Sequence, residues 1–387
     1  MNLPTAHAAA AMRSSRPKEP AEGFVAPARP AGYPPTMRKS LVDSLACPAC
    51  GDGAFDLVIH TARDRTRWAA EVGAGGDATV TDVEKGVLNC TRCSASFLIT
   101  AGIPRLLPPG VEDGPSTGHR LTTFEGAVAE HEENFRDLLG NVAPVVQIVE
   151  SGGAFLGRRV LDAGCGFGRH AAVAARWGAE VVAMDSSTEA VESAAKNLAP
   201  GGPSGSADIV QGDVRRPPFR RETFDHVYSF GVLHHVTDPA AAFAGLNSVL
   251  KPGGRLSLWV YGPRQGLTRV ATGALHGATA SMSSQSLYRF SLGLSAFLRV
   301  FAHTPHRFLS PVPGLDQIVN HLPTHDHAQW PFDVVVADVY DRLRVPVTHY
   351  FTGEELERWY GDAGYLDIQV TRRVRNTESF RATGIKR

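Results

Sequence analysis

The run from Val160 to His170, VLDAGCGFGRH, combines an acid with a glycine-rich turn. Asp162 ends a short apolar stretch, and Gly164, Gly166 and Gly168 follow at alternate positions. Such glycines allow positive φ and let the backbone approach a ligand without a Cβ in the way. The spacing D-x-G-x-G-x-G differs from the G-x-G-x-x-G of dinucleotide folds, where backbone amides face a pyrophosphate. The acid beside this loop favours a positively charged ligand.

Two further acids follow apolar stretches downstream of the glycines. Asp185 ends VVAMD, about 20 residues further on, a distance at which a carboxylate accepts both hydroxyls of a ribose. NAD-binding folds use an acid in the same way, so Asp185 alone does not separate the two kinds of site. Asp213 ends ADIVQGD, and His234 and His235 come after a fourth apolar stretch. In α/β folds ligands bind where such strands end, so we expect these residues near one site.

Strands that alternate with helical patterns predict a parallel α/β sheet in this part of the chain. The candidate strands are Arg159–Leu161, Glu180–Met184, Ala207–Val210, Phe224–Ser229 and Arg255–Tyr261. Residues 352–363 read as a helix, because Thr352 and Glu355 have the spacing of a capping box. Two more strands are expected at Leu366–Val370 and Ser379–Ile385.

These motifs and their order resemble the class I S-adenosylmethionine-dependent methyltransferases, and 160–261 resembles the type-11 branch that includes ubiquinone and menaquinone biosynthesis enzymes. The resemblance implies a Rossmann-like seven-stranded sheet with helices on both faces and an antiparallel last strand. It implies that the glycine loop holds the methionine part of the cofactor, Asp185 the ribose and Asp213 the adenine amino group. The cofactor-binding residues that it indicates are Asp162, Ala163, Gly164, Cys165, Gly166, Gly168, Asp185, Ser186, Asp213, Val214 and Phe230.

Catalytic residues are harder to assign, because methyl transfer from a sulfonium needs mainly in-line orientation and exclusion of water. A general base is needed only for a protonated hydroxyl or an acidic carbon. His234, His235, His349 and Tyr350 are weak candidates, and packing or pocket lining is the simpler role for the histidine pair. Residues 229–232 read SFGV instead of the Asn/Asp-Pro-Pro-Tyr/Phe signature of N-methyltransferases. This favours a small-molecule O- or C-acceptor.

Four of the five cysteines form two C-x-x-C hooks, Cys47/Cys50 and Cys90/Cys93. Two such hooks predict a tetrahedral Zn²⁺ site, and four protein ligands make it structural rather than catalytic. The segment CPAC…CTRC…FLITAGIPRLL resembles small zinc-ribbon proteins that accompany and activate some methyltransferases. Some of those proteins lack the cysteines, so the fold does not require the metal. The fifth cysteine, Cys165, is expected to be a small pocket-lining residue rather than a nucleophile.

Composition indicates an ordinary globular protein. Of 387 residues 43% are hydrophobic, and 39 basic residues balance 39 acidic ones. The resulting net charge of zero gives no sign of a dedicated binder of nucleic acid or anionic membranes. No apolar run reaches the roughly 18–20 residues of a membrane span, and no secretory segment is evident, so a cytoplasmic enzyme is expected.

The sequence predicts six segments, with the ordered protein beginning near Met37, itself a candidate translation start. They are a disordered tail (1–40), a zinc-ribbon-like domain (41–110), a helical lead-in (111–157), the S-adenosylmethionine-binding core (158–261), a substrate-binding or lid insertion (262–347) and a C-terminal helix with strands that complete the sheet (348–387).

The insertion contains several polar candidates for an acceptor pocket, namely Asp326, Asp333, Tyr340, Asp341, His349 and Tyr350 just beyond it. It also carries His303, His306, His321, His325 and His327. Pro323 disfavours a helical metal-binding face within the last three histidines, so a solvated loop is expected. An apolar helix near Ser286–Val300 is compatible with a lid, a homodimer contact or a membrane-surface contact.

Three functions remain open at this point. A small-molecule methyltransferase is favoured over an RNA methyltransferase that uses its ribbon for recognition, because acids are interspersed in the ribbon. Those acids are Asp52, Asp56, Asp64, Glu71, Asp77, Asp82 and Glu84. The third function is a cofactor-binding regulatory module without catalysis. A dehydrogenase is disfavoured by the glycine spacing.

Overall fold

The computed structural model describes most of the chain outside the first 35 residues. The described residues are 36–51, 53–67, 78–114, 128–139, 155–198, 207–263, 273–275, 277–279, 281–312, 314–319, 322, 324, 327–328, 332–344, 348–372 and 379–387. Residues 1–35 of the predicted tail lie outside this set, as do several residues singled out above, namely Asp52, Glu71, Asp77, His321, Pro323, His325 and Asp326.

A seven-stranded sheet forms the centre of the fold, in the order β11-β12-β10-β9-β6-β7-β8. Its strands are β6 (Arg159–Ala163), β7 (Glu180–Asp185), β8 (Ala207–Gln211), β9 (Phe224–Phe230), β10 (Leu250–Tyr261), β11 (Tyr365–Arg372) and β12 (Ser379–Lys386). β12 runs antiparallel to both of its neighbours, and the first five strands pair in parallel. The predicted Rossmann-like sheet with an antiparallel last strand is therefore confirmed.

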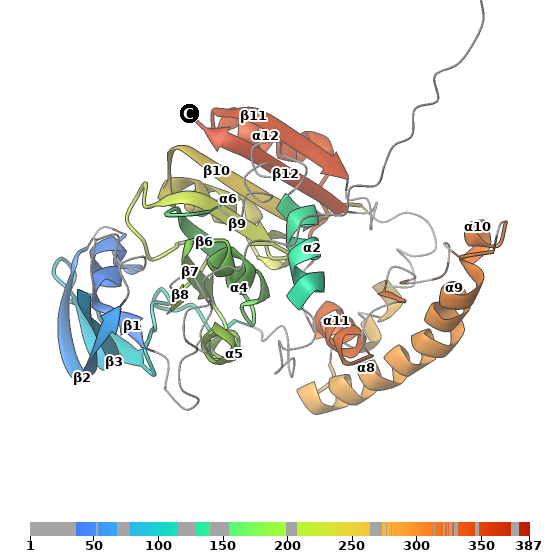
Figure 1. Ribbon diagram of the computed structural model, residues 1–387, viewed down its shortest axis with the longest axis horizontal. Coiled ribbons are helices and arrows are strands. Elements are labelled where there is room, and N and C mark those ends of the chain that lie inside the picture. Colours follow the sequence, from blue (N-terminus) through green and yellow to red (C-terminus); the bar gives the residue numbers. More distant parts are fainter. Residues whose placement is uncertain are drawn as a thin grey trace, which may run out of the picture.

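Alternate residues of the central strands enter two separate hydrophobic clusters. Leu161 and Val182 belong to one cluster, whereas Val160 and Val181 belong to the other. This alternation buries both faces of the sheet, as is usual for parallel strands. The first face is covered by α6 (Pro239–Val249) and α12 (Gly353–Asp362), and the second by α2 (Val128–Leu139), α4 (Arg169–Arg176) and α5 (Thr188–Leu198). Figure 1 shows the helices on the two sides of the sheet.

The start of α12 follows the predicted capping signal. The Oγ1 atom of Thr352 accepts a hydrogen bond from the amide of Glu355 at 3.2 Å. This bond satisfies one of the amides that the first turn of a helix leaves without a partner.

A second sheet of five antiparallel strands lies N-terminal to the core. It contains β1 (Met37–Arg38), β2 (Phe55–Arg67), β3 (Ala78–Cys90), β4 (Ser96–Thr100) and β5 (Ile103–Pro104), with a short 3-10 helix, η1 (Lys39–Ser44), after β1. β1 pairs with Asp82 and Val83 of β3. Residues 36–40, which the sequence analysis put in the disordered tail, thus belong to this zinc-ribbon-like domain.

The ribbon domain covers β8, the edge strand of the large sheet (Figure 1). Arg105 forms a parallel bridge with Gln211, and the Leu106 amide donates to the Gln211 carbonyl at 2.8 Å. Arg38 of β1 pairs with the buried carboxylate of Asp208, its Nε lying 2.6 Å from Oδ2. The two domains are therefore joined by backbone hydrogen bonds as well as side chains, and the ribbon domain covers the Gln211 end of the edge strand.

The insertion is largely helical. α8 (Ser284–Leu298) continues through a π-helical turn, η3 (Arg299–His303), into α9 (Thr304–Leu309), and α10 (Asp316–Val319) follows. α11 (Phe332–Arg344) packs along the inner side of α8 (Figure 1). The expected apolar helix near Ser286–Val300 is thus present. Among the described residues, none of the helices has both the length and the apolar character needed to cross a membrane.

Candidate active site

The predicted glycine loop connects β6 to α4 at the carboxyl edge of the large sheet. Gly164, Gly166 and Gly168 have φ of +84°, +54° and +87°, values that residues other than glycine rarely adopt. A Cβ on Gly164 would lie 2.2 Å from Cγ2 of Val232, in the loop after β9. A Cβ on Gly166 would meet open space. The first glycine therefore permits close packing of two loops, and the second leaves its backbone exposed to a ligand.

Two carboxylates flank this loop, Asp162, which is buried, and Asp185, which is half-buried. Asp162 is 2% exposed, and its Oδ2 has no hydrogen-bond partner among the described residues. Burial, with a smaller contribution from the neighbouring Asp185 carboxylate, raises the pKa of Asp162 to about 7. Asp185 accepts hydrogen bonds from the amides of Gly166 and Ser187, each at 2.9 Å, yet burial also raises its pKa. A positively charged ligand would favour the ionised form of both acids.

The turn after Asp185 is held by a network that sequence analysis missed. Nε2 of Gln211, at the end of β8, lies 2.9 Å from the Ser186 carbonyl and 3.0 Å from Oγ1 of Thr188. It also lies 3.2 Å from Oδ1 of Asp113, which accepts the Thr188 amide at 2.7 Å. Asp113 belongs to the segment that leaves the ribbon domain. The ribbon therefore helps to position the loop that carries Asp185.

Asp213 is placed near the end of β8 but is already paired. Its Oδ1 accepts the Arg215 amide at 2.8 Å, and its Oδ2 accepts Nη2 of Arg215 at 2.6 Å. Nε of Arg215 lies within 3.1 Å of both oxygens. The carboxylate is thus engaged by a guanidinium two residues away, which the resemblance did not suggest. Val214 between them is buried.

The other predicted cofactor residues lie in or next to the core. Phe230 stacks on Tyr228 with ring centroids 5.2 Å apart and contacts Phe135 of α2 at 6.0 Å. Its ring therefore faces the packed aromatic cluster. Ala163 and Cys165 are buried, whereas Ser186 is half-buried. Burial raises the pKa of the Cys165 thiol well above its usual value, so the thiol stays protonated and weakly nucleophilic.

The match to a known family covers this same region. The family described as "Methyltransferase domain" matches residues 161–258, from the end of β6 to β10. This part of the chain is similar to a methyltransferase domain. The glycine loop, Asp162, Asp185 and Asp213 all fall within its limits.

Two relatives match over about a quarter of the chain. Cycloartenol-C-24-methyltransferase 1 from Oryza sativa subsp. japonica is 33% identical over 98 residues, 25% of this chain and 28% of that protein. Ubiquinone biosynthesis O-methyltransferase from Paracidovorax citrulli is 36% identical over 108 residues, 27% of this chain and 42% of that protein. The chain thus spans less than half the length of these curated relatives.

A solved structure aligns over more of the chain. Phosphoethanolamine N-methyltransferase 2 from Haemonchus contortus, in complex with S-adenosyl-L-methionine, covers 87% of this chain and 70% of its own, with 15% identity and a TM-score of 0.38.

The weak catalytic candidates gather where β9 and β10 of the methyltransferase domain end. His234 and His235 form a short 3-10 turn, η2 (Leu233–His235), and the fully buried His234 ring stacks on Tyr261 at 3.8 Å. The His349 amide donates to the His234 carbonyl at 2.7 Å. Nε2 of His349 is buried and lacks a hydrogen-bond partner among the described residues. Tyr350 is 40% exposed.

The sequence analysis did not single out Tyr261 for this group, although its position at the end of β10 was a usable signal. The guanidinium of Arg342 on α11 lies 5.9 Å from the Tyr261 ring, so the insertion reaches this edge of the sheet. Tyr340, an acceptor-pocket candidate on the same helix, is 1% exposed and its hydroxyl is held by Arg344. Asp333 and Asp341 also lie on α11, but their side chains fall outside the described set.

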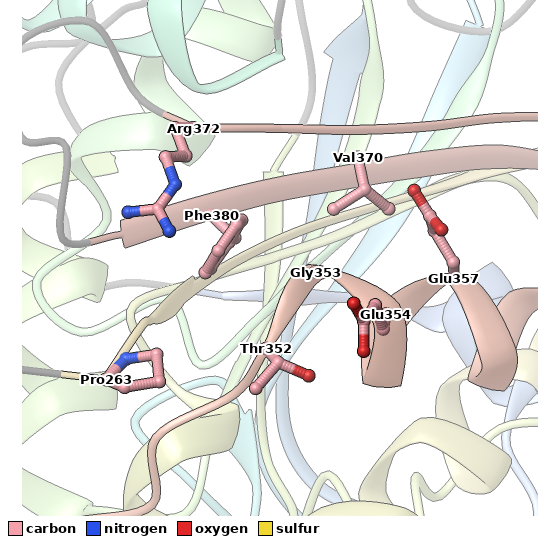
Figure 2. A pocket seen from close by; sticks show the side chains of 8 residues that line it. All are labelled: Pro263, Thr352, Gly353, Glu354, Glu357, Val370, Arg372 and Phe380. Carbon is pink, nitrogen blue, oxygen red and sulfur yellow. The ribbon is translucent and has the colours of Figure 1, made fainter.

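A hollow of about 440 Å³ opens at the same edge, three strands from β6 in the sheet order. Figure 2 shows it between the start of α12, Phe380 and Arg372 of the last two strands, and Pro263 after β10. Glu354 and Glu357 also line it. None of its lining residues belongs to the glycine loop, so it is separate from the predicted cofactor site.

The four ribbon cysteines converge on one point. Their sulfur atoms all lie within 4.8 Å of one another, with Cys47 and Cys93, and likewise Cys50 and Cys90, 3.7 Å apart. A tetrahedral ion with Zn–S bonds of about 2.3 Å separates its sulfurs by about 3.8 Å. A Cβ on Gly53 would lie 2.1 Å from the Cys90 sulfur, so this glycine leaves room for the cluster. The geometry therefore fits the predicted metal.

Proposed function

We propose that the protein is an S-adenosylmethionine-dependent methyltransferase that acts on a small-molecule O- or C-acceptor by in-line transfer. The observation that carries this proposal is the pair of acids around a positive-φ glycine loop, the buried Asp162 and the half-buried Asp185, inside the segment that matches a methyltransferase domain. S-adenosylmethionine carries a sulfonium and an ammonium group. Such a ligand would supply the positively charged partner that favours the ionised form of the two carboxyl groups.

The residues that hold the cofactor in this proposal are those that the resemblance implied. Asp162 and the amides around Gly166 receive the methionine end, and Asp185, oriented by two amides, receives the ribose hydroxyls. Asp213 is proposed for the adenine amino group, which competes there with Arg215. The full set is Asp162, Ala163, Gly164, Cys165, Gly166, Gly168, Asp185, Ser186, Asp213, Val214 and Phe230.

The bound cofactor would supply an electrophilic methyl group, and the protein would supply orientation and a dry site. η2 and α11 lie at the edge where the acceptor would enter, because His234 and Arg342 both contact Tyr261. If the acceptor is a protonated hydroxyl or an acidic carbon, His349 is the favoured base among the four candidates. Its buried Nε2 has no partner among the described residues and is available for a proton.

The acceptor class rests on the relatives and on the missing N-methyltransferase signature. The two relatives described above are named for methylation of cycloartenol at C-24 and for an O-methylation in ubiquinone biosynthesis, at 33% and 36% identity. We propose the same broad class of acceptor for this chain and name no single compound.

We also propose that Cys47, Cys50, Cys90 and Cys93 bind one structural Zn²⁺. The sulfur separations and the space left by Gly53 support the proposal. Four thiolates leave no open coordination position for a reacting water. The ion would therefore stabilise the fold of a small domain.

Calorimetry with S-adenosylmethionine, its demethylated product and NAD tests the cofactor. We expect the first two to bind and NAD not to bind. Asp185→Ala should weaken cofactor binding by at least tenfold, whereas Asp367→Ala, an exposed acid on β11, should leave it unchanged. Tight binding of NAD alone would refute the proposal.

Transfer of a labelled methyl group into cell extract tests the reaction. A labelled small molecule extractable from the reaction supports the proposed acceptor class. Loss of transfer after ribonuclease treatment would instead identify an RNA substrate, and cofactor binding without any transfer would identify a regulatory module.

A further inference from the structure

The rod formed by α8, η3 and α9 exposes several large apolar side chains. Phe297, Phe301 and Phe308 are 56%, 61% and 70% exposed. Other exposed apolar residues of the rod and of the segment after it are Leu292, Val300, Leu309, Val312, Leu315 and Ile318. We call the set from Leu292 to Ile318 the apolar face. Exposed apolar residues scattered singly are normal, but the rings of Phe297 and Phe301 lie 4.7 Å apart, and so many exposed apolar residues in one segment indicate an interaction surface.

The buried residues of the same rod are both apolar and polar, namely Leu287, Ala302, Ser291, Ser295 and His303. Ser291, Ser295 and His303 have no exposed surface, and α11 packs against α8. The Oγ atoms of Ser291 and Ser295 lack hydrogen-bond partners among the described residues. A helix of a water-soluble domain normally keeps its large apolar side chains inside, whereas here the phenylalanines Phe297, Phe301 and Phe308 lie outside. The rod is therefore organised for an apolar environment on its outer side.

The charge of this segment differs from that of the whole chain. Residues 281–319 contain three arginines, Arg289, Arg299 and Arg307, and one acid, Asp316. Arg289 and Arg307 are exposed, and Arg299 is half-buried. The complete chain has no net charge, so the positive charge here is a local property. An apolar face flanked by arginines is complementary to a partner that has an apolar interior beneath a negatively charged surface.

We infer that the apolar face docks on the surface of a lipid bilayer that contains anionic lipids. The rod spans residues 284–309, about 39 Å of helix, and lies along one margin of the molecule (Figure 1). It has the features of a helix that lies in the interface plane, with phenylalanines in the acyl boundary and arginines among headgroups. Membrane docking needs no methyl transfer, so this inference stands or fails separately from the proposed function.

Flotation of the full-length protein with vesicles tests the inference. We expect binding to vesicles of phosphatidylcholine with phosphatidylglycerol, and weaker binding to phosphatidylcholine alone. The triple variant Phe297→Ser, Phe301→Ser, Phe308→Ser should lower the partition coefficient on the order of a hundredfold. The control variant Leu98→Ser, Leu366→Ser removes apolar residues that are 58% and 46% exposed elsewhere and should float like the wild type.

A charge variant makes the test more specific. Arg289→Gln with Arg307→Gln should weaken binding to the anionic vesicles by about fivefold per arginine and leave binding to the neutral vesicles unchanged. Circular dichroism verifies that each variant is folded. Failure of the wild type to float, or equal flotation of the triple variant, would overturn the inference. A dimer in size-exclusion chromatography that the triple variant dissociates, without vesicle binding, would assign the apolar face to a second copy instead.

Discussion

Asp162→Asn should stabilise the fold and weaken cofactor binding at the same time. The Asp162 carboxyl is buried, and its pKa is raised from 3.8 to about 7. The folded protein therefore retains a proton that the unfolded chain releases. Stability falls as pH rises from about 4 to about 7 and is constant above that range. Asparagine has nearly the same shape but never ionises, so the variant escapes this loss.

The size of the effect follows from the pKa. One pKa unit corresponds to about 1.4 kcal/mol, so the shift costs the wild type about 4 kcal/mol at about pH 8. At about pH 5 most of that cost has disappeared. The advantage of the variant in unfolding free energy should therefore grow by about 3 kcal/mol between these two pH values.

Denaturant unfolding of both proteins across this pH range measures the difference. Asp225→Asn is a control of opposite sign. Burial alone would raise the pKa of Asp225, but the Lys251 ammonium at 2.9 Å and the Arg159 amide outweigh it and lower the pKa. Its amide variant should lose stability at neutral pH and regain it in acid. Parallel pH profiles for the wild type and Asp162→Asn would refute our account of the site.

Three further predictions concern other parts of the molecule. Gly164→Ala places a methyl group 2.2 Å from a neighbouring side chain and should abolish cofactor binding, whereas Gly253→Ala, also at positive φ but in open space, should only lower the melting temperature slightly. Gln211→Leu removes the contacts that hold the turn after β7, so calorimetry should show about fivefold to tenfold weaker cofactor binding. Cys90→Ser should lose bound zinc in metal analysis and lower the melting temperature, whereas Cys165→Ser should keep the zinc.

Most of the large sheet could be predicted because its signals are local. Apolar stretches that end in an acid or glycine mark strands such as β6 and β7, and the cap at Thr352 is encoded within four residues. The strand ends moved by a few residues, most at β10, where pairing with β9 resumes only at Arg255 after an irregularity. Such irregularities depend on the neighbouring strand.

Contacts between distant segments could not be predicted from the same patterns. Asp113 and Gln211 are 98 residues apart, and the sequence around either residue does not predict their contact. Asp213 and Arg215 are only two residues apart, but the resemblance predicted a contact of Asp213 with the cofactor rather than with this arginine. Equally, a net charge of zero concealed the arginines of α8 and α9, because opposite charges elsewhere in the chain cancel them.

The ribbon domain and the large sheet, which meet at β8, are parts of one chain. They are therefore always present in a one-to-one ratio. The edge of the sheet is paired by backbone around Arg105 and Leu106, which belong to the same polypeptide as the strand that they cover. A tether of this kind keeps the covering segment at a local concentration of the order of millimolar, whatever the expression level of the protein. The segment that covers β8 therefore does not have to bind from solution as a separate protein. A fragment that began after residue 114 would present β8 as an unpaired edge and would be prone to aggregate.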